Sequence, residues 1–170
     1  MDLYVVLLRL VHIFAGMFWV GAGVFMIGFV LPTVRALGTD GRAFMPGLVK
    51  YTRYTLAMPV ASLLTTLAGV LLYLRIVERV STAWITTPGG LVLTIGSIAG
   101  IAAFLIGVVV MGPTTKRMEM LAQEAEKHGP PSAEQTAELR KLQVRYGRMG
   151  IYTLVLMLIS LAGMAIARYI

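Results

Sequence analysis

Continuous blocks of apolar residues, separated by short polar stretches, run through this sequence. The blocks cover about residues 4–31, 55–74, 91–111 and 150–167, and each is close to, or longer than, the about 20 residues that a helix needs to cross a bilayer. Backbone polar groups in hydrocarbon must be paired within the protein, which allows only helices or a closed barrel. Because the blocks are continuous rather than alternating, they exclude the barrel and predict an all-α, integral membrane four-helix bundle in a single domain.

The polar stretches between the first three blocks predict two connections. Pro32 is expected to end the first span, and the polar stretch 33–50 after it contains Gly38-Thr39-Asp40-Gly41, which is typical of a loop. Residues 81–90 predict a short connection in which Trp84 serves as an interfacial anchor.

Residues 114–148 predict a helical hairpin that leaves the membrane between the third and fourth spans. Its first arm carries apolar residues at helical spacing, namely Met118, Leu121, Ala122 and Ala125. Its second arm begins with a capping box, in which Ser132 is the N-cap and Gln135 is the third helical residue. The arms are expected to rise on the order of 20 Å above the lipid.

The distribution of Lys and Arg predicts the orientation of the spans. Most of these residues fall in the first loop and in the hairpin: Arg35, Arg42, Lys50, Arg53, Lys116, Arg117, Lys127, Arg140, Lys141, Arg145 and Arg148. The middle loop and the C-terminus hold Arg75, Arg79 and Arg168. The positive-inside rule therefore puts the first loop and the hairpin in the cytoplasm, with both termini outside.

The composition narrows the possible chemistry. The chain is 58% hydrophobic and 14% charged, which is too apolar for a soluble domain. Its net charge of +7 is explained by basic loops that meet anionic lipid, and we expect no nucleic-acid partner. The sequence contains no cysteine, so disulfides, iron–sulfur clusters and thiolate metal sites are excluded.

Ionisable residues are rare inside the predicted spans, and such residues are functional candidates by default. Arg9 and His12 lie in the first span, and no Asp, Glu or Lys lies deep in any span. This argues against a proton pump, an ion-coupled transporter and hydrolytic catalysis. His12 shares one helical face with Gly16, Trp19 and Gly23.

This face permits two interpretations. A haem between helices needs an imidazole ligand for its iron and small residues where the ring passes, which His12, Gly16 and Trp19 would supply. Alternatively, His12 only hydrogen-bonds a Thr or Ser of a neighbouring helix, and the glycines only pack helices. Arg9 either snorkels to the outer surface or pairs with a haem propionate.

The second axial ligand of such a haem is left open. His128, the other histidine, lies in the predicted cytoplasmic turn and cannot meet His12 across the membrane. The alternatives are a Met, a Tyr, water, no ligand, or His12 of a second chain. Candidates in the outer half of the predicted bundle are Tyr73, Met164 and Tyr169.

Three segments resemble a known group of small membrane proteins. Val11-His12-Ile13-Phe14-Ala15-Gly16-Met17-Phe18-Trp19-Val20-Gly21 is similar to the first helix of the group that includes HemJ-type protoporphyrinogen oxidases, CopD-type copper-resistance membrane proteins, the membrane part of a cytochrome-linked urate oxidase, and uncharacterised four-helix proteins. The segments 29–35 and 53–59 resemble the end of that helix and the start of the next.

The resemblance implies haem binding at His12, because the histidine of the first helix is implicated in haem binding in the HemJ-like members. This chain lacks most of the further His and basic residues of the oxidases, and the His and Met residues that the copper-resistance members carry at the outer face. It is therefore most similar to the uncharacterised four-helix branch.

The sequence as a whole predicts a haem-binding integral membrane protein. We expect b-type haem, with His12 as the metal ligand and with Gly16, Trp19 and Arg9 at the cofactor, in electron transfer or haem-linked oxidation. The main alternative is a non-catalytic subunit or assembly factor of a larger membrane complex, and the third is transport of a metal or small solute. The expected location is the bacterial inner (cytoplasmic) membrane, with complex subunits or a second copy of the chain as protein partners. Whether the chain is an enzyme is left open.

Overall fold

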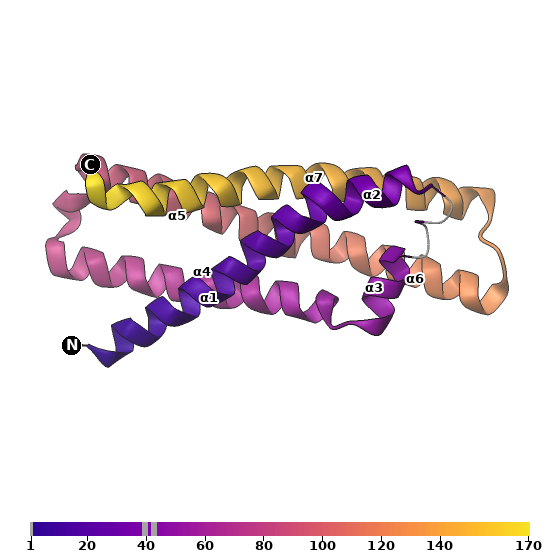
Figure 1. Ribbon diagram of the computed structural model, residues 1–170, viewed down its shortest axis with the longest axis horizontal. Coiled ribbons are helices and arrows are strands. Elements are labelled where there is room, and N and C mark those ends of the chain that lie inside the picture. Colours follow the sequence, from indigo (N-terminus) through magenta and orange to yellow (C-terminus); the bar gives the residue numbers. More distant parts are fainter. Residues whose placement is uncertain (1, 39–40, 42–43) are drawn as a thin grey trace.

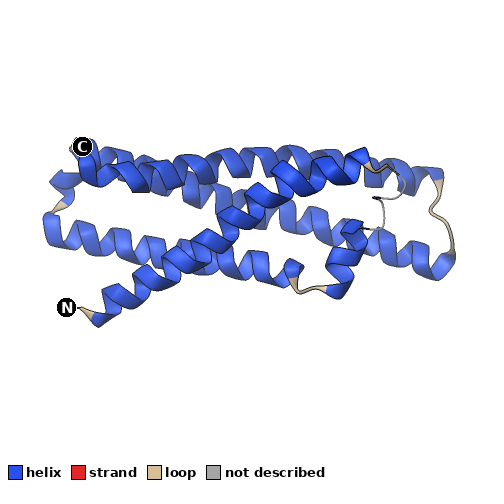
Figure 2. Cartoon of the chain, in the orientation of Figure 1, coloured by secondary structure: helices blue, strands red, loops and turns tan. Residues whose placement is uncertain are grey.

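The structure, a computed structural model, describes residues 2–38, 41 and 44–170 of the chain. It is all-helical, with 93% of residues in helices, and the described residues contain no strand (Figure 2). Of the polar stretch 33–50, which was predicted to contain the first loop, Thr39, Asp40, Arg42 and Ala43 lie outside the described part.

Four of the helical segments are long and apolar enough to cross a membrane: Leu3–Ala36, Tyr54–Val80, Pro88–His128 and Ala133–Tyr169. The first segment consists of α1 (Leu3–Phe25), the π-helical turn η1 (Met26–Val30) and α2 (Leu31–Ala36), and the second is α4 (Tyr54–Val80). The third consists of α5 (Pro88–Ile106), the π-helical turn η4 (Gly107–Met111) and α6 (Gly112–His128). The fourth is α7 (Ala133–Ile166), which is followed by the 3-10 turn η5 (Ala167–Tyr169). The prediction of four membrane-length apolar helices is confirmed.

The helix of the first span does not end at Pro32, contrary to the prediction. The π-helical turn η1 ends two residues before Pro32, and the N–H of Leu31 bonds to the carbonyl of Met26. Pro32 then occupies the first turn of α2, where its missing N–H and fixed φ are tolerated. The hydroxyl of Thr33 donates to the carbonyl of Phe29 at 2.7 Å, which supplies a hydrogen bond just beside the proline.

The third span passes Pro113 by the same means. The π-helical turn η4 precedes it, and the N–H of Gly112 bonds to the carbonyl of Gly107. The hydroxyl of Thr114 donates to the carbonyl of Val110 at 2.6 Å. In both spans, a π-helical turn is thus followed by a proline and then by a threonine that bonds four residues back.

The polar stretch 33–50 also contains more structure than predicted. A short helix, α3 (Phe44–Tyr51), occupies its second half, and it was missed because its apolar residues are too few to suggest a span. The middle connection contains the 3-10 turn η3 (Thr82–Thr86). The capping box at the start of α7 is confirmed, since Ser132 and Gln135 make both of its hydrogen bonds.

The long helices pack mainly as two pairs, α1 with α4 and α5 with α7. Both chain ends lie at the same end of the molecule as the middle connection, whereas α3 and the turn between α6 and α7 lie at the other end (Figure 1). We refer to these as the terminal end and the hairpin end. The helix α1 crosses the molecule obliquely and approaches α7 in its second half, where the methyl group of Met157 lies against Gly23.

Small residues form the closest helix contacts, as is usual in membrane bundles. On α5 and α7, a Cβ added to Gly163 would lie 3.0 Å from the carbonyl oxygen of Val92 and 3.1 Å from the Cα of Gly96. The buried cluster at the centre consists of Trp19, Ala61, Ala103 and Met157. Large apolar side chains face outward instead, with Phe14 and Met17 each 67% exposed, as lipid-facing residues would be.

At the hairpin end, α6 and the first part of α7 are joined by polar contacts. The guanidinium of Arg117 donates from Nε and Nη2 to the two carboxylate oxygens of Glu138, at 2.7 and 2.9 Å. These hydrogen bonds hold the pKa of Glu138, which lies outside the predicted spans, below its usual value. The side-chain amide of Gln135 donates to Glu124 at 3.0 Å.

Candidate functional site

A cavity of about 690 Å³ lies between the two helix pairs. This volume falls within the range of about 300–1,000 Å³ that is typical of small-molecule and cofactor sites. Its lining comes from all four long helices and is mostly apolar. The polar side chains in the lining are His12, Thr65, Thr66, Tyr73, Thr94, Ser97 and Ser160. Some lining residues are themselves exposed on the outside of the bundle, such as Ile98 at 61% and Leu161 at 54%, so the cavity opens sideways between helices.

His12 is fixed in this lining by a hydrogen bond to the next helix. Its Nδ1 atom lies 2.8 Å from the backbone carbonyl oxygen of Thr65 on α4. A carbonyl oxygen only accepts hydrogen bonds, so Nδ1 carries the proton. In the neutral imidazole, Nε2 then holds the free lone pair, and no hydrogen bond among the described residues uses it. A metal-ligating histidine usually donates a hydrogen bond from one ring nitrogen to a backbone carbonyl and binds the metal through the other nitrogen.

Two glycines make room for the imidazole and for the cavity beside it. A Cβ added to Gly69 would lie 2.7 Å from Cε1 and 3.0 Å from Nδ1 of His12, so the ring packs directly on the backbone of α4. A Cβ added to Gly16 would lie 3.5 Å from the methyl group of Thr65. The hydroxyl oxygen of Thr65 is buried and has no hydrogen-bond partner among the described residues, which leaves one polar group at this site unsatisfied.

A chain of hydroxyls borders the cavity toward the terminal end. The hydroxyl of Thr94 lies 2.7 Å from the carbonyl of Gly90 and 2.6 Å from the hydroxyl of Tyr73. Because Thr94 has only one proton to give and the carbonyl can only accept it, Tyr73 donates to Thr94. This bond joins α4 to α5 at the border of the cavity, and the ring centroids of Tyr73 and Trp84 lie 6.4 Å apart.

The residues predicted for the site are only partly brought together. His12, Gly16 and Trp19 all line the cavity, and Trp19 is 8% exposed. Arg9 is exposed and is not part of the lining, so its role at a propionate stays a prediction. Of the candidates for a second ligand, Tyr73 and Met164 line the cavity; Tyr169 is 73% exposed at the chain end.

Sequence reasoning missed the contribution of α4. Thr65 anchors the imidazole through its backbone, and Gly69 supports the ring. The available signal was a Thr-Thr pair followed by a glycine one turn later within an otherwise apolar run, since polar and small residues of membrane helices usually face other helices.

The four apolar helices support the class of all-helical membrane proteins, and all four line one cavity. Comparisons of the chain with protein-family models, with curated proteins and with solved structures find no match. The resemblance of residues 11–21, 29–35 and 53–59 to the HemJ/CopD-like group therefore stays a prediction.

Proposed function

We propose that this protein binds a b-type haem in the cavity between its helix pairs, with His12 as an axial ligand to the iron. The observation that carries the proposal is the hydrogen bond from Nδ1 of His12 to the carbonyl of Thr65. That bond orients the imidazole and leaves Nε2 free as a metal ligand. The same bond would serve a merely structural histidine, but a structural role would not require a cavity of this size beside the ring.

The residues of the cavity suit a flat, largely apolar prosthetic group. Gly16 and Gly69 line the cavity beside His12 without side chains of their own, and Trp19 adds an aromatic side chain to the same lining. Tyr73 and Met164 stay candidates for the second axial ligand. A bound haem would supply one-electron redox chemistry, whose potential depends on the axial ligands and on burial. The apolar lining would exclude water from the iron and so influence that potential.

We further propose that the bundle spans the bacterial inner (cytoplasmic) membrane, with the hairpin end in the cytoplasm and both termini outside. This rests on the excess of Lys and Arg at the hairpin end. With no native cysteine in the chain, single cysteines report sidedness directly. A cysteine at the exposed Ala133 should be labelled by an impermeant maleimide only from the cytoplasm, and one at the exposed Ala83 only from outside. The opposite pattern would reverse the orientation.

The function is tested by an absorption spectrum of the detergent-purified protein, recorded oxidised and then reduced with dithionite. The expected result is a Soret band, with α and β bands that sharpen on reduction. A protein that stays colourless, even after expression with added haem, would contradict haem binding. His12 would then be a packing residue, and a subunit or assembly factor of a membrane complex would become the function to pursue, tested by the partners that co-purify.

A further inference from the structure

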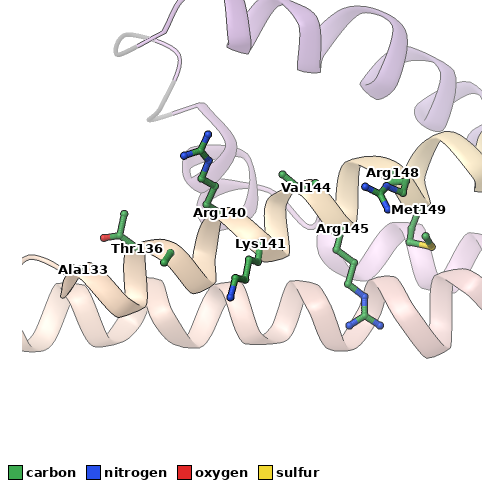
Figure 3. Close-up of a pocket in the computed structure, with 9 residues that line it drawn as sticks. Ala133, Thr136, Arg140, Lys141, Val144, Arg145, Arg148 and Met149 are labelled. Atoms are coloured by element: carbon green, nitrogen blue, oxygen red, sulfur yellow. The ribbon is translucent and has the colours of Figure 1, made fainter.

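A basic groove runs along the first part of α7, at the opposite end of the molecule from His12. It is open, because residues of α7 alone line it: Ala133, Thr136, Ala137, Arg140, Lys141, Val144, Arg145, Arg148 and Met149. Figure 3 shows the cationic side chains in two rows, Arg140 and Arg148 on one side and Lys141 and Arg145 on the other. Val144, which is 56% exposed, lies between Arg140 and Arg148 within the first row.

The positive charge of this groove is not neutralised within the described part of the chain. The ion pairs found there use Lys50, Arg75, Arg79 and Arg117, and none uses a cation of the groove. Residues 139–149 include no Asp or Glu. Glu138 accepts two hydrogen bonds from Arg117, and the positive charge of Lys141 also lowers the pKa of this carboxyl group. Glu134, an exposed residue at the outer end of the same stretch, takes part in no ion pair among the described residues. The groove therefore presents four cations, with one carboxylate at its outer end, to an external anion.

The position of the groove relative to the lipid indicates what that anion is. The predicted span begins at Gly150, so Arg148 and Arg145 lie about 3 and 7.5 Å beyond it along the helix. The headgroup layer on each side of a bilayer is about 5–8 Å thick. These two arginines are thus at headgroup depth. Arg140 and Lys141 lie about 13–15 Å out, where the potential of an anionic surface is still felt.

The same face of α7 continues into the membrane as an apolar surface. Ile151, Tyr152 and Val155 follow the groove on this face and are 54%, 53% and 48% exposed. A phospholipid with its phosphate among the arginines would therefore lay its acyl chains along these residues. An acidic protein would match the charges but would gain nothing from the apolar continuation, which favours a lipid.

We propose that this groove binds the headgroup of an anionic phospholipid in the leaflet at the hairpin end. Arg145 and Arg148 contact the phosphate, while Arg140 and Lys141 attract the lipid electrostatically from farther outside the membrane. Met149, which lies closer to the span than either arginine, contacts the glycerol region. Clusters of basic residues next to a membrane span are a recurrent form of anionic-lipid recognition, and here the apolar side chains of Val144 and Met149 lie among the cations.

The test compares thermal unfolding of the detergent-purified full chain with added phosphatidylglycerol, with phosphatidylcholine and with glycerol 3-phosphate. Phosphatidylglycerol should raise the Tm of the wild type more than phosphatidylcholine, and glycerol 3-phosphate alone should not. In the variant Arg145→Gln/Arg148→Gln, the phosphatidylglycerol concentration that gives half of the Tm increase should rise roughly 10- to 30-fold, because each cation contributes about 1 kcal/mol to the binding free energy.

A control variant removes the same charge at the terminal end, Arg79→Gln/Arg168→Gln, and should respond to phosphatidylglycerol like the wild type. Equal unfolding temperatures of both variants in phosphatidylcholine would show that the substitutions leave the fold intact. An unchanged response of Arg145→Gln/Arg148→Gln would overturn the proposal, and so would an equal response of the wild type to both lipids. No response of the wild type to either lipid would also overturn it and leave the groove to an acidic protein partner.

Discussion

Replacement of His12 by alanine is expected to abolish the haem spectrum while leaving a folded, membrane-inserted protein. The substitution removes Nε2, the atom that we propose as an axial ligand to the iron. It also removes the hydrogen bond to the carbonyl of Thr65, which costs only about 1 kcal/mol of stability. Haem absorbance per mole of purified protein, with gel filtration to verify the fold, gives the answer. Retained absorbance would show that the ligand assignment is wrong.

The glycine beneath the imidazole provides a second variant that leaves His12 in place. In Gly69→Ala, the new methyl group would lie 2.7 Å from Cε1 of His12, so the ring must move and the bond to Thr65 must lengthen. We expect haem content to fall several-fold. Gly21→Ala is the matched control, because Gly21 also lines the cavity but a Cβ there meets nothing within 4 Å. Equal losses in both variants would indicate a general effect of filling the cavity.

The largest loss of stability is expected from Gly163→Val, at the crossing of α5 and α7. The atoms that a Cβ would meet are backbone atoms, the carbonyl oxygen of Val92 at 3.0 Å and the Cα of Gly96 at 3.1 Å, so no side-chain rotation relieves the contact. Forced overpacking of this kind costs about 1–3 kcal/mol. The Tm in detergent should fall clearly, whereas Ala162→Val, at an exposed neighbour on the same helix, should change little. A similar Tm for both variants would mean that α5 and α7 can move apart at Gly163 without a loss of stability.

Much of the fold is predictable because apolar length and capping chemistry are local signals. The four apolar helices follow from block length, and the start of α7 from Ser132 and Gln135. The continuation past Pro32 is not predictable in this way. Proline ordinarily ends or kinks a helix, and the π-helical turn that precedes it has no distinctive composition.

The site is less predictable because it depends on which helices become neighbours. The face of α1 that carries His12, Gly16 and Trp19 is visible from helical spacing. Nothing local to α1 reveals that Thr65 and Gly69 receive the imidazole, since they lie more than 50 residues away and belong to the helix with which α1 pairs. The cavity itself results from the separation between two helix pairs.

The two π-helical turns make the effect of a change in chain length depend on where it falls. A π turn bonds five residues back instead of four, so each of η1 and η4 accommodates about one residue more than an α-helix would. Deleting one residue from η4 would let this turn close as ordinary α-helix, and α6 would keep its rotation relative to α5, with Arg117 still facing Glu138. Deleting one residue from α6 between η4 and Arg117 would instead rotate Arg117 by about 100° away from Glu138. A deletion should therefore be tolerated better inside the π-helical turns than in the helices beside them.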